Sequence, residues 1–189
     1  MIEGPVAFRS NELRIRGNRY VLTSPSQTDF EWRSAVVWAK CDGGCPADEE
    51  GHIMPAMDHW CGIYATLAIH TLELHINGHL SVVALVEGLD SNLPKGGNIW
   101  LHESDPGESY YWHAGFRAPG AQIVYLVDVT SGGGKSFSEM TDRHTIDKHM
   151  MSMLSVAQQF HVDIITWKDA LWIARHQWEK HREWHGERA

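Results

Sequence analysis

The sequence predicts an α+β fold, with a small β-rich body that contains a metal-ordered loop and one helix, followed by a C-terminal helical pair. Short apolar runs separated by turn residues fill most of residues 1–130, which is typical of strands. Residues 137–189 instead carry apolar side chains at helical spacing. We therefore expect a β-rich, zinc-stapled body over residues 1–130, a Gly-rich hinge over 131–136 and a helical appendage over 137–189.

The first forty residues predict short strands. Apolar runs at 6–9, 13–16 and 20–23 are separated by turn residues at Asn11 and Gly17-Asn18. A further strand is expected over 34–40, and it leads the chain to Cys41. Residues 41–60 then have no periodicity, and a loop of that length inside a compact domain needs something to order it.

The middle of the chain predicts one helix and several strands. Ile63, Leu67 and Leu72 recur at helical spacing, with Gly78 just past the end, so a helix is expected over 63–76. Strands are expected over 80–87, 98–102, 110–113 and 122–127.

The C-terminal part predicts two helices, over 141–160 and from Thr166 onward, where Asp169 follows in a capping-box position. Each has an apolar stripe, and two helices of this size are expected to close on each other through one stripe. Met151 and Trp172 fall off the stripes, so we expect them to face the β body or a second molecule. The stripes are Ile146, Met150, Met153, Leu154 and Ala157, then Trp167, Leu171, Ala174 and Trp178.

Composition excludes several classes of protein. The 189 residues carry 16 Lys and Arg against 24 Asp and Glu, and the net charge of −8 disfavours nucleic acid and anionic membranes as partners. No apolar window is long enough for a transmembrane helix, and residues 1–5 do not resemble a secretory signal, so a cytoplasmic protein is expected. Three cysteines are typical of reduced thiols there.

A zinc site is the strongest chemical prediction. Cys41, His52, His59 and Cys61 fall within the one long segment that has no other means of ordering, and zinc prefers four such ligands in a tetrahedron. Cys45 is a fifth candidate that could replace Cys41. The alternative is that these thiols pack as small apolar groups among scattered histidines.

Two stretches resemble a motif of uncharacterised actinobacterial and actinobacteriophage proteins. Residues 61–65 (Cys-Gly-Ile-Tyr-Ala), preceded by His52-x-x-Pro55, are similar to the end of their Cys…His-x-x-Pro…Cys-x-Cys-Gly-Ile-Tyr-Ala pattern. His102-Glu103 and residues 115–118 (Gly-Phe-Arg-Ala) resemble their downstream His-Glu-x-Gly-aromatic-Arg-Ala stretch.

The resemblance covers residues 35–126 and has two departures. His59 stands where the first Cys of the Cys-x-Cys pair is usual, which preserves the capacity to bind zinc. An insertion around residues 105–108 separates His102 from Gly115, which puts a role for His102 in doubt. The resemblance implies a metal-stapled fold and no particular reaction.

Other motifs are weaker. Gly134-Lys135-Ser136 resembles the end of a P-loop, but Val129 stands where its first glycine would be, so a solvated hinge is favoured. His70, Glu73 and His75 match no zinc-protease spacing and are expected on the surface of a helix. The C-terminal tryptophans and basic residues could stack with single strands, but core packing or a protein surface fits the acidic chain better.

These observations favour a non-enzymatic, zinc-stabilised protein-interaction module, an accessory protein of an actinobacterium or its phage that acts on a host protein or associates with itself. The alternative is a zinc-dependent hydrolase in which three of the four ligands hold zinc and water takes the fourth position.

Overall fold

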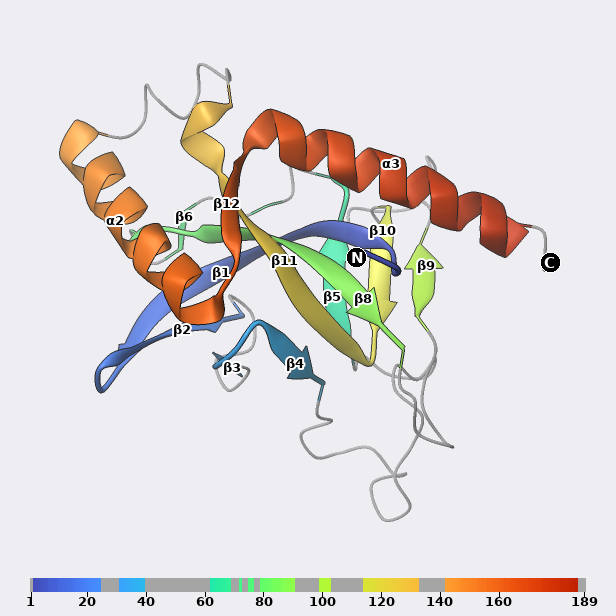
Figure 1. The fold of residues 1–189 in the computed structure, drawn as a ribbon, viewed down its shortest axis with the longest axis horizontal. Coiled ribbons are helices and arrows are strands. Elements are labelled where there is room, and N and C mark those ends of the chain that lie inside the picture. The colour runs from blue at the N-terminus through green and yellow to red at the C-terminus, as the bar shows by residue number, and fades with distance from the viewer. Residues whose placement is uncertain are drawn as a thin grey trace, which may run out of the picture.

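The computed structural model describes residues 2–24, 31–39, 62–68, 72, 75–76, 79–90, 99–102, 114–132 and 142–186. These residues form a mostly antiparallel β-sheet with two long helices, so the α+β class predicted from the sequence is confirmed (Figure 1). No described helix is long and apolar enough to cross a membrane.

The strands and helices follow one another along the chain with strands dominating the first two thirds. The strands are β1 (Val6–Arg16), β2 (Arg19–Thr23), β3 (Glu31–Trp32), β4 (Val36–Trp38), β5 (Ile63–Thr66), β6 (His75–Ile76), β7 (His79–Leu80), β8 (Val82–Leu89), β9 (Trp100–His102), β10 (Gly115–Ala118), β11 (Gly120–Asp128) and β12 (Asp163–Thr166). The helices are the short 3-10 helix η2 (Val129–Ser131) and the α-helices α2 (Arg143–Phe160) and α3 (Trp167–Gly186).

One large sheet contains most of the described strands. Its central path runs β12-β11-β8-β1-β5-β10-β9, with β2 and β3 attached beside β1 and with β4 attached to β11. Among the described strands only β11 and β12 pair in parallel, because α2 carries the chain back between them as a crossover. Strands β6 and β7 form a separate hairpin.

Both faces of the central strands are covered, which explains why β8 is apolar at nearly every position. Val82, Ala84 and Val86 point into one core, whereas Val83 and Leu85 point into the other, and all five are fully buried. Successive side chains of a strand point to opposite faces, so a strand covered on both sides needs apolar residues throughout.

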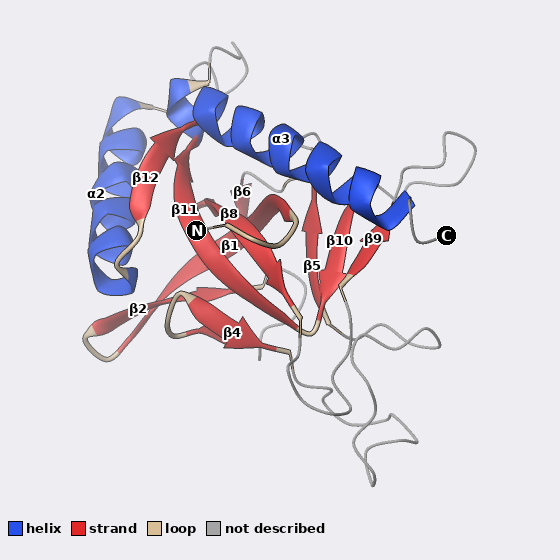
Figure 2. Ribbon diagram, turned by 45° about the vertical axis from the view of Figure 1, so that its right-hand side comes forward, coloured by secondary structure: helices blue, strands red, loops and turns tan. Residues whose placement is uncertain are grey.

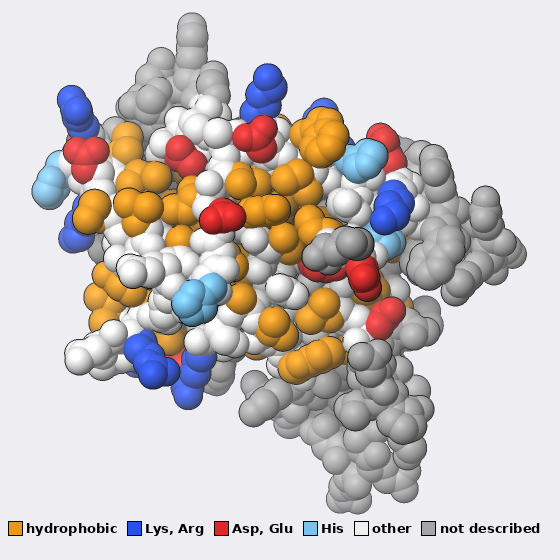
Figure 3. Space-filling model, in the orientation of Figure 1, with side chains coloured by type: hydrophobic (Ala, Val, Ile, Leu, Met, Phe, Trp, Pro, Cys, Tyr) orange, Lys and Arg blue, Asp and Glu red, His pale blue; other side chains and the backbone are white. Residues whose placement is uncertain are grey.

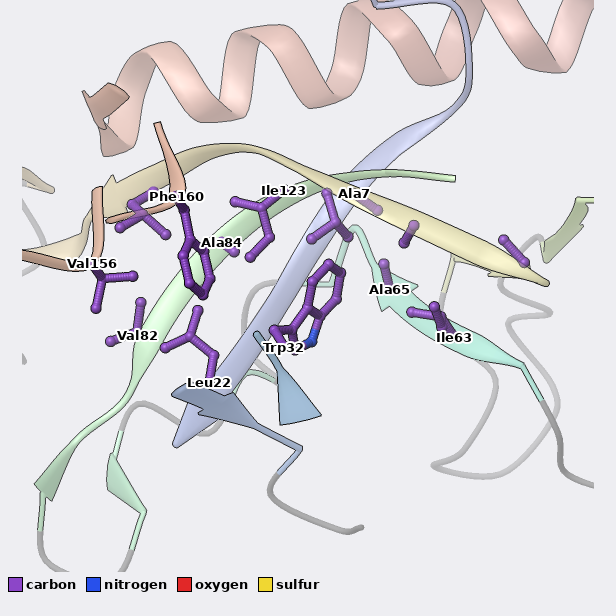
Figure 4. Close-up of a cluster of buried hydrophobic side chains, with 14 of the residues drawn as sticks. Ala7, Leu22, Trp32, Ile63, Ala65, Val82, Ala84, Ile123, Val156 and Phe160 are labelled. Atoms are coloured by element: carbon purple, nitrogen blue, oxygen red, sulfur yellow. The ribbon is translucent and has the colours of Figure 1, made fainter. Parts of the chain in front are cut away.

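The first face is covered by α2 and by β2, β3 and β4. Helix α2 contributes Met153, Val156, Ala157 and Phe160 to this core. The ring of Trp32, on β3, is fully buried among side chains from the central strands (Figure 4). Asn11, expected in a turn, instead lies within β1 at this face, where its Nδ2 donates to the carbonyl oxygen of Val82 at 3.2 Å.

Helix α3 covers the opposite face, as the turned view shows (Figure 2). Ala170 and Ala174 are fully buried against the strands, and the Trp167 ring lies 5.4 Å from that of Phe8. Small side chains let the helix approach the sheet closely. The expectation that the two helices close on each other is therefore wrong, because each helix packs its buried side chains against a different face of the sheet.

Side-chain and backbone caps define the ends of the helices, and the cap predicted at Thr166 is present. The Asp142 carboxylate accepts from the backbone N–H of Thr145, and α2 ends at His161 in the left-handed conformation (φ 55°). At α3, the Thr166 hydroxyl accepts from the backbone N–H of Asp169 at 3.2 Å. Ser131 Oγ accepts from the N–H of Trp167 at 2.9 Å, so the described start of the Gly-rich segment is fastened to α3.

The helix expected over residues 63–76 is wrong where the structure describes it. Ile63–Thr66 is strand β5 and His75–Ile76 is strand β6. Ile63 and Ala65 face the core while Tyr64 and Thr66 alternate with them, which is a strand period that four residues cannot distinguish from a helical one. Pairing with β10, a strand that the sequence did not predict, determines that residues 63–66 form a strand.

Deleting residues 137–189 should abolish folding of the rest of the chain. The deletion removes β12 from the sheet and uncovers both apolar faces, a loss that exceeds a total stability of about 5–15 kcal/mol. Circular dichroism during urea unfolding should show no cooperative transition for residues 1–136. The sequence alone predicts the opposite, that residues 1–136 fold by themselves, and a sharp transition would support that prediction.

Two variants of the full chain form a matched pair. Ala174→Asp, at a buried position, should destabilise the fold strongly, and Arg175→Asp, at an exposed neighbour, should not.

Candidate functional site

The predicted zinc ligands Cys41, His52, His59 and Cys61, and the fifth candidate Cys45, lie outside the described residues. Among the residues that the structure does describe, no three His, Cys, Asp or Glu side chains are grouped so that they could hold a metal ion. The prediction of a zinc site therefore stays a prediction, and the residues that flank the segment are what the structure adds.

Those flanking residues lie at one end of the sheet, around the turn from β10 to β11. The backbone N–H of Ala39 donates to the carbonyl oxygen of Pro119 at 2.8 Å, and Ile63 pairs with Ala118. The chain thus leaves the described structure after Ala39 and returns at Gly62 beside the same turn. Cys41 and Cys61 are each two residues from one of these anchors, Ala39 and Ile63.

A second segment is anchored at the same end. Leu89 pairs with Gly120, and the Asp90 carboxylate accepts from the backbone N–H of Ile99 at 2.8 Å. The ring of Trp38 packs closely on Gly120, where a Cβ would lie 2.4 Å from it, so a larger residue there would require the ring to shift. This turn is therefore the point on which four described chain ends converge.

The two stretches that carry the motif resemblance are neighbours in the sheet. Residues 63–66 form β5 and residues 115–118 form β10, and the two strands pair along their whole length. Gly115 also pairs with His102 on β9. A Cβ at Gly115 would lie 2.1 Å from the carbonyl oxygen of Ala65, so this close approach requires glycine.

Arg117 lies at the centre of this group of strands. Its guanidinium carbon is 5.3 Å from the ring centroid of Tyr64 on one side and 5.3 Å from that of Trp100 on the other. The side chain is buried, and a cation between two aromatic faces is stabilised by their quadrupoles. Arg9 Nη1 donates to the carbonyl oxygen of Tyr64 at 2.6 Å, and burial lowers the pKa of Arg9 to about 10, so it stays protonated at neutral pH. Two arginines thus hold Tyr64.

Glu87 is a buried carboxylate that sequence reasoning missed. Its Oε1 accepts from the backbone N–H of Glu3 at 2.7 Å and from that of Gly4 at 2.6 Å. A charged residue within the apolar run of β8 was the available signal. The bonds fasten the N-terminal segment beside β8, so the role that the structure gives Glu87 is structural.

The remaining sequence candidates gain no support as catalytic groups. Lys135, His70 and Glu73 lie outside the described residues. His75 belongs to the β6–β7 hairpin, so the helix expected to carry it is absent there.

The outward faces of the helices expose large apolar side chains. Trp172 on α3 and Met151 on α2 are each 66% exposed, and Leu154, expected in the buried stripe of α2, is 53% exposed. The expectation that Met151 and Trp172 lie off the buried stripes is confirmed, but neither is covered by the β body. Figure 3 shows hydrophobic side chains in a band across α2, β12 and the start of α3.

Trp172 is held in a defined orientation. Its ring stacks on that of His176, one helical turn further on, with centroids 5.2 Å apart and an interplanar angle of 8°. The stack stands on the solvent side of α3, with Trp172 66% exposed.

Comparisons of the chain with protein-family models, curated protein sequences and solved structures find no match.

His149 should make stability fall at acidic pH. It is buried on α2, its Nε2 has no hydrogen-bond partner among the described residues, and burial lowers its pKa, an effect that Asp128 partly opposes. The folded state therefore favours neutral His149, so its contribution is complete above the unfolded pKa of 6.5 and declines as the pH falls through that value.

To isolate this effect, the free energy of unfolding of His149→Leu and of the wild type would be measured in urea at several pH values. Each unit of difference between folded and unfolded pKa is worth about 1.4 kcal/mol, so the variant should lose less stability between neutral and acidic pH. His144→Leu, at an exposed position of the same helix, should keep the wild-type slope. Equal slopes for wild type and His149→Leu would rule out His149 as the source.

Proposed function

We propose that this protein is a non-enzymatic, zinc-stabilised protein-interaction module, an accessory protein that acts on a protein of an actinobacterial host. The observation that carries the proposal is the Trp172–His176 stack, which stands on the solvent face of α3 with Trp172 66% exposed. Burial of a large ring that a folded protein leaves in water is a strong source of binding energy.

The geometry of the stack favours recognition. A tryptophan that already rests on His176 loses little rotational freedom when a partner covers it, which lowers the entropic cost of binding. Lys168 and Arg175 lie one turn before and after Trp172 on the same side of the helix, so charged groups border the apolar centre. An apolar centre with a polar rim is the usual anatomy of a protein interface.

Helix α2 supplies a second apolar area of different character. Met151 and Leu154 are exposed there, and methionine adapts its shape to a partner more readily than tryptophan does. Both helices are held by the sheet through their buried stripes, so their outward residues are presented on a rigid support. A protein partner fits the net charge of −8 better than a nucleic acid does.

Zinc enters this proposal as a structural ion. The candidate ligands follow Ala39 and precede Gly62, and both of these residues lie at the β10–β11 turn, away from the exposed helix faces. Zinc held by Cys41, His52, His59 and Cys61 would close the intervening segment on itself at that end. Four protein ligands would leave no position for a reacting water.

The zinc proposal predicts about one zinc per chain in protein purified without an affinity tag, because the four ligands complete one tetrahedron. Cys61→Ser should lower both the metal content by elemental analysis and the melting temperature, since metal binding contributes to folding. Cys45→Ser should change neither. A metal content near zero, with all three thiols open to titration, would contradict the proposal, and three ligands plus water would favour the hydrolase.

The interaction proposal predicts that Trp172→Ala weakens binding of a captured partner about 30-fold, the effect of losing about 2 kcal/mol at a hot spot. The partner would be isolated from actinobacterial lysate on the wild-type protein and its affinity measured by calorimetry. Val36→Ser, which changes an exposed apolar residue on β4, is the matched control and should bind normally. Equal affinity for Trp172→Ala and wild type would exclude this surface.

A further inference from the structure

The β1–β2 hairpin gathers arginines at one end of the molecule. The two strands are joined by Gly17-Asn18, with Gly17 at φ 61°, and Arg16 pairs directly with Arg19. The hairpin projects from the body below α2 (Figure 1), and Figure 3 shows Lys and Arg side chains at that edge. Like charges directly opposite each other are destabilising, so this pairing has a local cost.

The acidic residues that the structure describes around the hairpin do not balance these arginines. Arg14 Nε and Nη2 donate to Glu12 Oε2 at 3.2 and 2.8 Å. Glu31 on β3 accepts from both Arg16, at 3.2 Å, and Arg33, at 2.9 Å. These bonds lower the pKa of Glu31, and the bond from Arg33 has the largest effect. Glu31 therefore stays ionised at neutral pH.

Among the described residues around the hairpin, two positive charges remain in excess. Four arginines (Arg14, Arg16, Arg19 and Arg33) stand against two glutamates, and among the described residues no carboxylate forms an ion pair with Arg19. The side chains of Arg16 and Arg33 are 60% and 80% exposed, so each has donors that face water. Ile15, between Arg14 and Arg16, is 66% exposed and adds an apolar side chain at the same tip.

A contact from α2 holds the hairpin in place. The Gln159 side chain accepts from the backbone N–H of Tyr20 at 3.0 Å and donates to its carbonyl oxygen at 2.7 Å, as a neighbouring strand would. The open edge of β2 is thereby closed at Tyr20, beside Arg19. The arginines are presented by a fixed backbone, which lowers the entropic cost of engaging them.

The charge of this hairpin is opposite to that of the chain. The protein carries −8 overall, and residues 41–108 carry eleven acidic residues against one basic residue. A local positive pole on an acidic protein orients an approaching acidic partner toward that pole while the rest of the surface repels it. The same overall charge repels the long, uniform charge of a nucleic acid.

We propose that the β1–β2 hairpin is a docking surface for an acidic segment of a partner protein. The side chains of Arg14 and Arg33 already bind carboxylates through Nε and Nη2, which is the geometry that a glutamate or aspartate of the partner would use at Arg19. At Arg16 and Arg33 the partner would instead contact the donors that Glu31 does not occupy. This surface is separate from Trp172 and does not depend on the function proposed for α3.

The test measures binding of a fluorescent glutamate-rich peptide to the full chain by polarisation at low and physiological salt. Arg19→Glu/Arg33→Glu should weaken binding about tenfold more than Arg143→Glu/Lys180→Glu, which makes the same charge change at exposed positions of the helices. Binding should decline with salt, and a peptide with glutamine in place of glutamate should not bind. Trp172→Ala should bind the peptide normally, which separates this proposal from the preceding one.

Each of the following results would overturn the proposal: equal weakening by the two double variants, equal binding of the glutamine peptide, or tighter hairpin-dependent binding of a single-stranded oligonucleotide than of the peptide. Self-association of the wild type that is lost in Arg19→Glu/Arg33→Glu would assign the surface to a second copy instead. If the double variant unfolds, the single variant Arg19→Gln is the test, because Arg19 makes no ion pair with a described residue that its loss would disturb. Arg19→Gln should weaken binding of the peptide about threefold, and unchanged binding would overturn the proposal.

Discussion

Coverage of both faces of the central strands is the constraint on which the rest of the structure depends. Strands β1, β8 and β11 present apolar side chains in both directions, and a sheet of this kind is stable only when each face is removed from water. Helix α2 and the strands around Trp32 cover one face, while α3 covers the other. The parallel strand β12 connects the two helices and extends the sheet, so the C-terminal residues complete the core.

This arrangement also determines what the molecule can offer to a partner. A helix that rests on a sheet exposes the side opposite its buried stripe, and on α3 that side carries the stacked pair Trp172 and His176. At the hairpin, Gln159 of α2 holds the backbone of Tyr20 and so presents Arg16 and Arg19 rigidly. Both proposed surfaces are therefore outward sides of elements whose inward sides stabilise the fold.

The β10–β11 turn has a different role, as an anchor for chain segments. Ala39, Ile63 and Leu89 are all fixed beside residues 118–120, and the candidate zinc ligands belong to the segment between the first two of these anchors. Beside it, Arg117 between Tyr64 and Trp100 fastens β5, β10 and β9 to one another. The part of the sheet that bears the motif resemblance is thus held by aromatic and cationic contacts as well as by backbone pairing.

The sequence by itself determined the α+β class, the two C-terminal helices, the cap at the start of α3, the turn at Gly17-Asn18 and the buried strand β8, because each depends on local spacing or on one residue's backbone preference. Only the tertiary structure decided that residues 63–66 form a strand, since their pattern is too short to identify without β10 beside it. It also decided which face each helix covers and brought Glu87, Arg117 and Gln159 to their partners. Those contacts join residues far apart in the chain, and no local pattern specifies which distant groups a fold brings together.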